Sequence, residues 1–141
     1  MHRQNLLRLV RAFLWGLIIA VVLIGCSTIS EQSKMTRFEK ISKRYRELML
    51  LSEFEAAYRF GNTENMTEDV NLDALKNIRV TDYALKSYDV SNDRSEINQS
   101  VEMEYYWAGR YRVRTILDKQ IWKYDEVKQT WVLQTGLPRF E

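Results

Sequence analysis

The hydrophobic period of the chain changes once, and this change limits the folds that the chain can adopt. From Met35 to Met49, apolar residues recur every three or four positions, as on one face of an amphipathic helix. From Ile78 onward the chain is rich in Val, Ile, Thr, Tyr and Trp with alternating polarity, which is typical of strands. The pattern predicts four strands, over residues 78–90, 96–106, 110–123 and 130–135. We therefore predict an α+β fold with N-terminal amphipathic helices packed on a curved antiparallel sheet of about four strands.

Local signals predict where the shorter helices begin and end. Ser52 and Glu55 form an S-x-x-E capping box, which predicts a second helix that stops at Gly61. Residues 62–70 are polar and are predicted to be a loop. Asn71 is expected to cap a short helical turn after it.

The turn between the second and third strands predicts a specific register. A three-residue loop, Trp107-Ala108-Gly109, with glycine in the left-handed position is a common hairpin connection. The resulting cross-strand pairs are Tyr105–Tyr111, Met103–Val113, Glu104–Arg112 and Glu102–Arg114. One face is then apolar and the other is charge-paired. We therefore expect the three arginines near this turn to be ion-paired sheet surface, and not a stripe that binds nucleic acid or acidic glycans.

The N-terminus has the composition of a secretory signal peptide. The first eleven residues carry three arginines and no acid, and residues 12–25 form an apolar run without a charge. The apolar region of a signal peptide has about 7–15 residues, whereas a membrane-spanning helix needs about 20. We therefore predict a signal peptide, and an uncleaved signal anchor over residues 12 to about 29 is the alternative.

The end of this run resembles the lipobox of bacterial lipoproteins, in the residues Leu23, Ile24, Gly25 and Cys26. The resemblance implies cleavage between Gly25 and Cys26, a diacylglycerol on the Cys26 sulfur and an acylated new amino terminus. Two or more acyl chains anchor a protein stably to a membrane. In Gram-negative envelopes, Ser27 at the next position implies the outer membrane, facing the periplasm.

Cleavage at the lipobox would divide the chain into three parts: a removed signal peptide (1–25), a lipidated cysteine with a short tether (26–32) and a single domain (33–141). The signal peptide contains three of the 21 basic residues and none of the 19 acidic ones, so the formal net charge would change from +2 to −1.

The signal peptide also contains His2, the only histidine, while lipid would occupy Cys26, the only cysteine. Cys/His zinc sites, haem ligation by histidine, Ser-His-Asp and Cys-His catalysis and disulfide scaffolds are thereby excluded from the mature chain. We expect no metal and no cofactor, and secretion and the negative charge argue against nucleic acid.

Three segments resemble the nuclear-transport-factor-2-like superfamily, which has a cone-shaped α+β fold: LMLLSEFEAAYRF, LKNIRVTDYAL and IWKYDEVKQTWVL. That superfamily includes ketosteroid isomerases and polyketide cyclases, which use Asp and Tyr inside the cone, and many members that only bind or assemble. No catalytic position can be matched residue by residue, so the resemblance implies a fold and no activity. It implies a cone-like arrangement of the helices and the sheet, and a cystatin-like arrangement is the alternative.

Asp82 is the carboxylate that best fits a pocket. On a regular strand it shares a face with Ile78 and Val80, so an apolar face would contain an acid, which desolvation would turn into a candidate general base. The possible pocket consists of Asp82, Tyr83, Tyr105 and Tyr111. A β-bulge near residues 81–82 would instead leave Asp82 in water.

These observations predict a membrane-anchored envelope lipoprotein whose domain binds another envelope protein or acts as an accessory subunit, without enzymatic activity. The alternative is a small apolar-ligand binder or an isomerase-like enzyme that uses a cone-shaped pocket with Asp82.

The aromatic residues near the end of the chain are expected to lie in the core, around a final hairpin with its turn at residues 125–129: Trp122, Tyr124, Trp131 and Phe140.

Overall fold

The computed structural model describes residues 31–61 and 70–141, and residues 34–141 form one compact unit. The predicted signal peptide, the lipobox and most of the tether lie outside the described residues. Within the described ranges, no helix is long and apolar enough to cross a bilayer.

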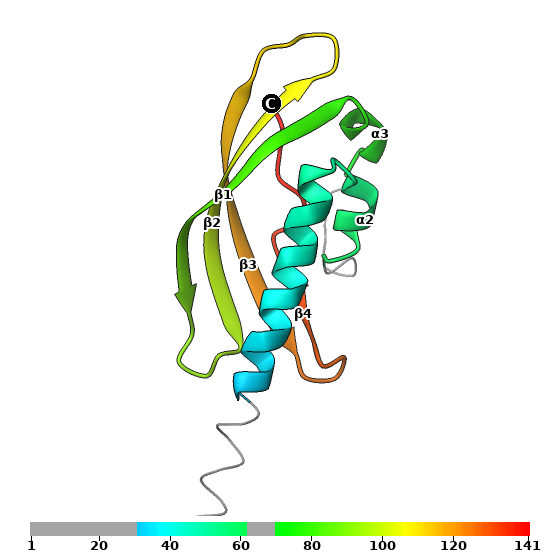
Figure 1. The fold of residues 1–141 in the computed structure, drawn as a ribbon. Coiled ribbons are helices and arrows are strands. Elements are labelled where there is room, and N and C mark those ends of the chain that lie inside the picture. Colours follow the sequence, from blue (N-terminus) through cyan, green and yellow to red (C-terminus); the bar gives the residue numbers. More distant parts are fainter. Residues whose placement is uncertain (1–30, 62–69) are drawn as a thin grey trace, which may run out of the picture. The chain divides into compact units, whose positions relative to one another are not determined.

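A four-stranded antiparallel sheet forms the body of this unit. Its strands follow one another in sequence order: β1 (Ile78–Val90), β2 (Glu96–Trp107), β3 (Arg114–Asp125) and β4 (Thr130–Leu133). The sheet is curved and unclosed (Figure 1). A helix over residues 31–50, here called the long helix, packs against it, and two short helices follow: α2 (Phe54–Tyr58) and α3 (Leu72–Leu75). The predicted α+β fold with a curved four-stranded antiparallel sheet is confirmed.

Aromatic residues join the long helix to the sheet. Trp122 of β3 is fully buried, and its ring makes edge-on contacts with Phe38 and Tyr45 of the long helix at centroid distances of 5.9 Å and 5.4 Å. Trp131 is also buried and contacts Phe38 at 5.2 Å. Each large side chain removed from water in this way stabilises the fold by about 1.5–3 kcal/mol. The expectation that the late aromatic residues form core is confirmed, with Phe140 partly buried against this cluster.

Two bulges in β1 decide which of its residues face the core. The register against β2 shifts between Val80 and Asp82 and again between Leu85 and Ser87. After the first shift Tyr83 lies in the core and Asp82 is exposed. The bulge alternative predicted from the sequence is therefore confirmed.

The register of the β2–β3 hairpin differs from the prediction by three residues. Gly109 has the expected positive φ, +89°, but the loop extends over residues 108–113 and Met103 pairs with Ile116 in place of Val113. Because three is an odd number, the shift exchanges the two faces of β3. The predicted charge pairs are wrong: Glu102 lies opposite Leu117 and forms an ion pair with Lys86 of β1 at 2.8 Å.

The later part of β3 explains this shift. In the predicted register Lys119 and Lys123 would point into the core and Trp122 and Tyr124 would point to water. The observed register buries Trp122 and Tyr124 and leaves both lysines exposed. The gain from two large aromatic side chains outweighs the turn preference at Gly109.

Ser52 ends the long helix, contrary to the predicted capping box. It has a left-handed φ of 58°, its N–H donates to Met49 O at 2.9 Å, and the N–H of Glu53 donates to Leu48 O at 2.9 Å. This is the Schellman arrangement of a helix C-terminus. The Ser52 hydroxyl accepts from the N–H of Val80 at 3.0 Å.

The two short helices differ in how they are capped. α2 has Glu53 as its N-cap without a side-chain capping bond, and α2 ends at Tyr58, before the predicted stop at Gly61. Asn71 caps α3 as predicted, because its Oδ1 accepts from the N–H of Ala74 at 3.1 Å.

Candidate functional site

A cluster of polar side chains lies inside the concave face of the sheet. The Oε1 atom of Gln120 accepts from Gln99 Nε2 at 2.6 Å, from the Tyr83 hydroxyl at 3.2 Å and from Trp122 Nε1 at 3.3 Å. Its Nε2 atom donates to Asp118 Oδ2 at 2.7 Å. Burial raises the pKa of Asp118 to about 6, against the opposing effect of the hydrogen bond from Gln120. The cluster therefore contains a carboxyl group that can exchange a proton near neutral pH.

Two tyrosines border this cluster. Burial raises the pKa of Tyr83 and of Tyr45, and the negative charge of Asp118 raises both further. The buried Tyr45 hydroxyl has no hydrogen-bond partner among the described residues. A cavity of about 270 Å³ between the long helix and β1 is lined by Tyr83 and Gln99, and Asp118 is not among its lining residues. This cavity therefore does not open onto the carboxyl group.

The structure does not bring the four predicted pocket residues together. Asp82 is exposed on β1, and Tyr111 is 87% exposed in the β2–β3 loop. Tyr83 and Tyr105 are buried on different strands, and the Tyr105 hydroxyl donates to Glu141 O at 2.6 Å. Asp118 is the acid that faces the interior.

Sequence reasoning missed Asp118 because it assumed the wrong register for β3. The signal was present, since Trp122 and Tyr124 require the even-numbered residues of this strand to face the core. Asp118 and Gln120 then share that face by the two-residue period of a strand.

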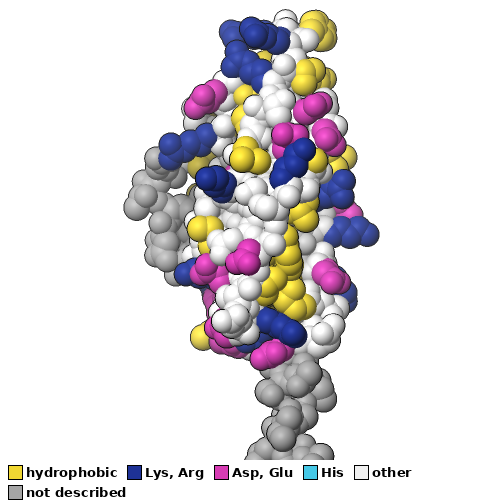
Figure 2. All heavy atoms as spheres, turned by 90° about the vertical axis from the view of Figure 1, so that its left-hand side faces the viewer, with side chains coloured by type: hydrophobic (Ala, Val, Ile, Leu, Met, Phe, Trp, Pro, Cys, Tyr) yellow, Lys and Arg dark blue, Asp and Glu magenta, His cyan; other side chains and the backbone are white. Residues whose placement is uncertain are grey.

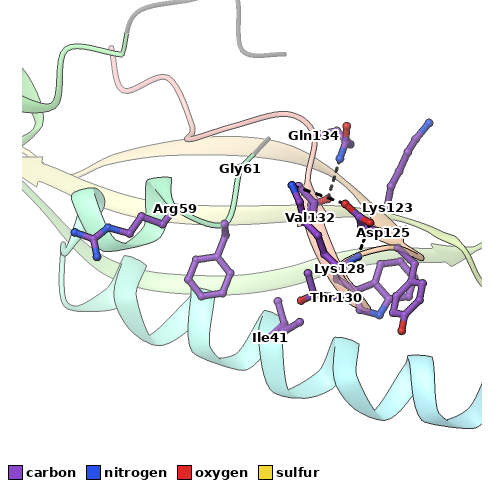
Figure 3. A pocket seen from close by; sticks show the side chains of 12 residues that line it. Ile41, Arg59, Gly61, Lys123, Asp125, Lys128, Thr130, Val132 and Gln134 are labelled. Atoms are coloured by element: carbon purple, nitrogen blue, oxygen red, sulfur yellow. Dashed lines mark hydrogen bonds and ion pairs between the residues drawn. The ribbon is translucent and has the colours of Figure 1, made fainter. Parts of the chain in front are cut away.

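A groove of about 720 Å³ lies between the long helix, the end of α2 and the β3–β4 hairpin (Figure 3). Its basic residues already have acidic partners: Arg59 with Glu55 at 3.8 Å, Lys123 with Glu96 at 3.2 Å and Lys128 with Asp125 at 3.9 Å. None of the four predicted pocket residues lines this groove. The tyrosine and the carboxylate on its walls have partners within the protein: the Tyr124 hydroxyl donates to Gln129 Oε1 at 3.2 Å, and Asp125 Oδ1 accepts from the N–H groups of Val127 and Lys128 at 2.9 Å and 2.8 Å.

The β2–β3 loop exposes apolar and cationic side chains together. Tyr111 is 87% exposed and Val113 is 55% exposed. Arg110 and Arg112, on either side of Tyr111, are exposed, and neither side chain has a hydrogen bond or ion pair with another described residue. Figure 2 shows Lys and Arg side chains gathered at the upper end of the face that it draws, where this loop lies in Figure 1.

The base of the loop is held in place. Arg114 lies over the ring of Trp107 at 5.0 Å and donates to the backbone O of Glu141. The Trp107 ring contacts Tyr105 at 5.2 Å. The N–H of Arg110 donates to Trp107 O at 2.9 Å and closes a turn in which Gly109 is the third residue, where a type II turn needs a positive φ. The exposed tip therefore stands on an ordered base.

Tyr111 has a backbone conformation that is uncommon for its type. Its φ is +42°, in the left-handed region that costs a residue with a side chain roughly 1–2 kcal/mol. Such strain is concentrated at binding and catalytic sites, where the surrounding structure maintains it. Exposure and strain at one aromatic residue make the loop tip the strongest candidate surface of the unit.

Comparison with protein families, curated proteins and solved structures finds no significant match. The lipoprotein and nuclear-transport-factor-2-like resemblances therefore remain predictions.

Proposed function

We propose that the protein is a membrane-anchored envelope lipoprotein whose domain binds another envelope protein as a non-enzymatic accessory unit. The lipobox Leu23–Cys26 supports the anchor, and Ser27 supports the outer membrane, facing the periplasm. The β2–β3 loop is the proposed contact surface.

The exposure and the left-handed backbone of Tyr111 are the main support for this proposal. Tyrosine and arginine are enriched among the residues that dominate the energy of protein interfaces. Here an exposed tyrosine in a left-handed conformation stands between two exposed arginines, on an ordered base. A loop ordered before binding loses little conformational entropy when a partner binds.

The interior of the concave face also favours contact over catalysis. A cone-shaped fold would hold a small ligand there, but large side chains occupy the space and are fully buried: Trp122, Tyr45, Tyr105, Met49 and Met103. Binding at the outer surface needs no such cavity.

Site-specific photo-crosslinking in the native envelope tests the proposal. A photoreactive residue at position 111 is expected to crosslink to one defined envelope protein. Val127 provides the control position, because it is 93% exposed on the β3–β4 turn, outside the proposed surface. Absence of a product from position 111, or the same products from both positions, would refute the proposal.

A further inference from the structure

We infer that the β2–β3 loop binds an acidic segment of its protein partner, with carboxylates placed against Arg110 and Arg112 and an apolar contact on Tyr111. This inference rests on the proposed function and adds the chemistry of the partner.

The charge distribution along the chain points to an acidic partner. No acidic residue occurs between Glu104 and Asp118, a stretch that contains three arginines. Arg114 is held at the base of the loop by the C-terminal backbone and Trp107. The guanidinium groups of Arg110 and Arg112 are left to face solvent.

Two lysines of the sheet, by contrast, pair with glutamates on adjacent strands. Lys86 pairs with Glu102 at 2.8 Å and Lys123 pairs with Glu96 at 3.2 Å. The loop arginines differ from them in lacking such a partner among the described residues. Guanidinium groups bind carboxylates through two parallel hydrogen bonds, so two exposed arginines fit two or more partner carboxylates.

The apolar part of the loop favours a protein over a simple polyanion. Tyr111 and Val113 expose 87% and 55% of their surface next to the arginines. A protein segment can bury these side chains and pair the guanidinium groups at the same time. Tyrosine and arginine are both enriched in interface hot spots.

The position of the loop argues against an anionic membrane as the binding partner. The chain enters the compact unit at Lys34, whose Nζ pairs with Glu126 Oε1 at 2.5 Å and whose backbone O accepts from Trp131 Nε1 at 2.9 Å. Lys34 therefore lies beside the β3–β4 turn. Figure 1 shows the β2–β3 loop at the other end of the sheet. A membrane anchor that precedes Lys34 would join the unit at the end away from the loop.

Binding of a fluorescent oligoglutamate peptide to the full-length protein in neutral detergent tests the inference. Arg110→Glu with Arg112→Glu is expected to lower the affinity at least tenfold. Arg110→Lys with Arg112→Lys should retain part of it, because lysine keeps the charge and loses the two-bond geometry. Raising the salt concentration should weaken binding of the wild-type protein, since the contact is made between exposed charges.

A matched control keeps the same change in net charge. Lys40→Glu with Lys43→Glu reverses two exposed cations on the long helix, and should change the affinity less than twofold. Equal losses in the two double variants would overturn the inference, because they would show a general effect of charge. Circular dichroism spectra of both variants establish that they are folded.

Two further measurements separate this inference from the proposed function. Vesicles of phosphatidylglycerol and a sulfated glycan replace the peptide in parallel titrations, and tighter loop-dependent binding of either one would overturn the inference in favour of lipid or glycan. The crosslinking from position 111 is then repeated in the variant with Arg110→Glu and Arg112→Glu. If the partner segment is acidic, the crosslinked product is lost. An unchanged crosslink overturns the acidic partner and leaves the proposed function standing, whereas no wild-type crosslink from position 111 refutes the proposed function itself.

Discussion

Asp118 places an ionisable carboxyl group against the core, held by one hydrogen bond from Gln120 at 2.7 Å. Its pKa is raised to about 6 by burial, so the folded state favours the protonated acid. The unfolded chain loses this proton near pH 4. The folded state therefore binds more protons than the unfolded state between these pH values, and stability falls as the pH rises through the interval.

Asp118→Asn is expected to stabilise the protein at neutral pH. A raise from about 4 to about 6 corresponds to about 3 kcal/mol at 1.4 kcal/mol for each pKa unit, and partial exposure of Asp118 reduces the expected gain to about 1–2 kcal/mol. The asparagine amide oxygen can still accept from Gln120. Urea unfolding of both proteins at several pH values measures the difference, which should increase from pH 4 to pH 7. A difference that does not change with pH would contradict the position of Asp118.

Ser52 provides a second test at the level of one residue. Ser52→Ala removes the acceptor of the partly buried Val80 N–H and should lower the free energy of unfolding by about 1–2 kcal/mol. Glu55→Ala should change it by less than about 0.5 kcal/mol, because Glu55 is exposed and only pairs with Arg59 at 3.8 Å. Thermal or urea unfolding distinguishes the two. Equal losses would restore the capping box that the sequence predicts.

At the scale of elements, the β2–β3 hairpin shows how a strand chooses its register. The turn signal at Gly109 is real, because the residue has a φ of +89°. The strand nevertheless shifts by three residues, and this shift buries Trp122 and Tyr124. Residues 108–113 form a longer loop than predicted. Arg110 and Arg112 lie in this loop and do not pair with the glutamates of β2.

Gly109→Ala tests the conformation of this turn. A Cβ at this position meets no atom within 4 Å, so the cost comes from the positive φ alone. We expect a loss of about 1 kcal/mol in the free energy of unfolding. Gly109→Asn should cost less, because asparagine tolerates the left-handed region better. Equal stability of all three proteins in urea unfolding would show that the turn does not require this conformation.

At the scale of the whole molecule, the point where the chain enters the unit and the proposed contact surface lie at opposite ends of the sheet (Figure 1). The chain enters the unit beside the β3–β4 turn, and the β2–β3 loop lies at the other end (Figure 1). An anchored protein built in this way would present its loop away from the end that receives the anchor.

The anchor can be tested on the mature protein. Mass spectrometry is expected to find an acylated Cys26 at the amino terminus, and Cys26→Ser should release the protein from the membrane fraction. The three acyl chains of the predicted lipid would determine this partitioning, because each buried methylene contributes about 0.8 kcal/mol. An intact Met1 on a membrane-bound chain would support the uncleaved signal anchor instead.

The fold class and the bounds of β1 can be predicted from the sequence alone, because the switch from helical to alternating periodicity is a local property. The sequence also predicts that Asn71 caps a helix and that Gly109 has a positive φ, since both depend on backbone groups nearby in sequence. It left two possibilities for Asp82, and the bulge in β1 decided between them.

The register of β3 and the residues of the candidate surface depend on contacts between distant parts of the chain. Register depends on which face of a strand meets the long helix, and the contacts of Trp122 with Phe38 and Tyr45 join residues more than seventy positions apart. In the register that these contacts favour, Asp118 shares the core-facing side of β3 with Trp122, and Tyr111 lies in the loop before the strand. The hydrophobic effect acts on the total apolar area that is buried, so a local turn preference gives way when a shift buries two large aromatic side chains.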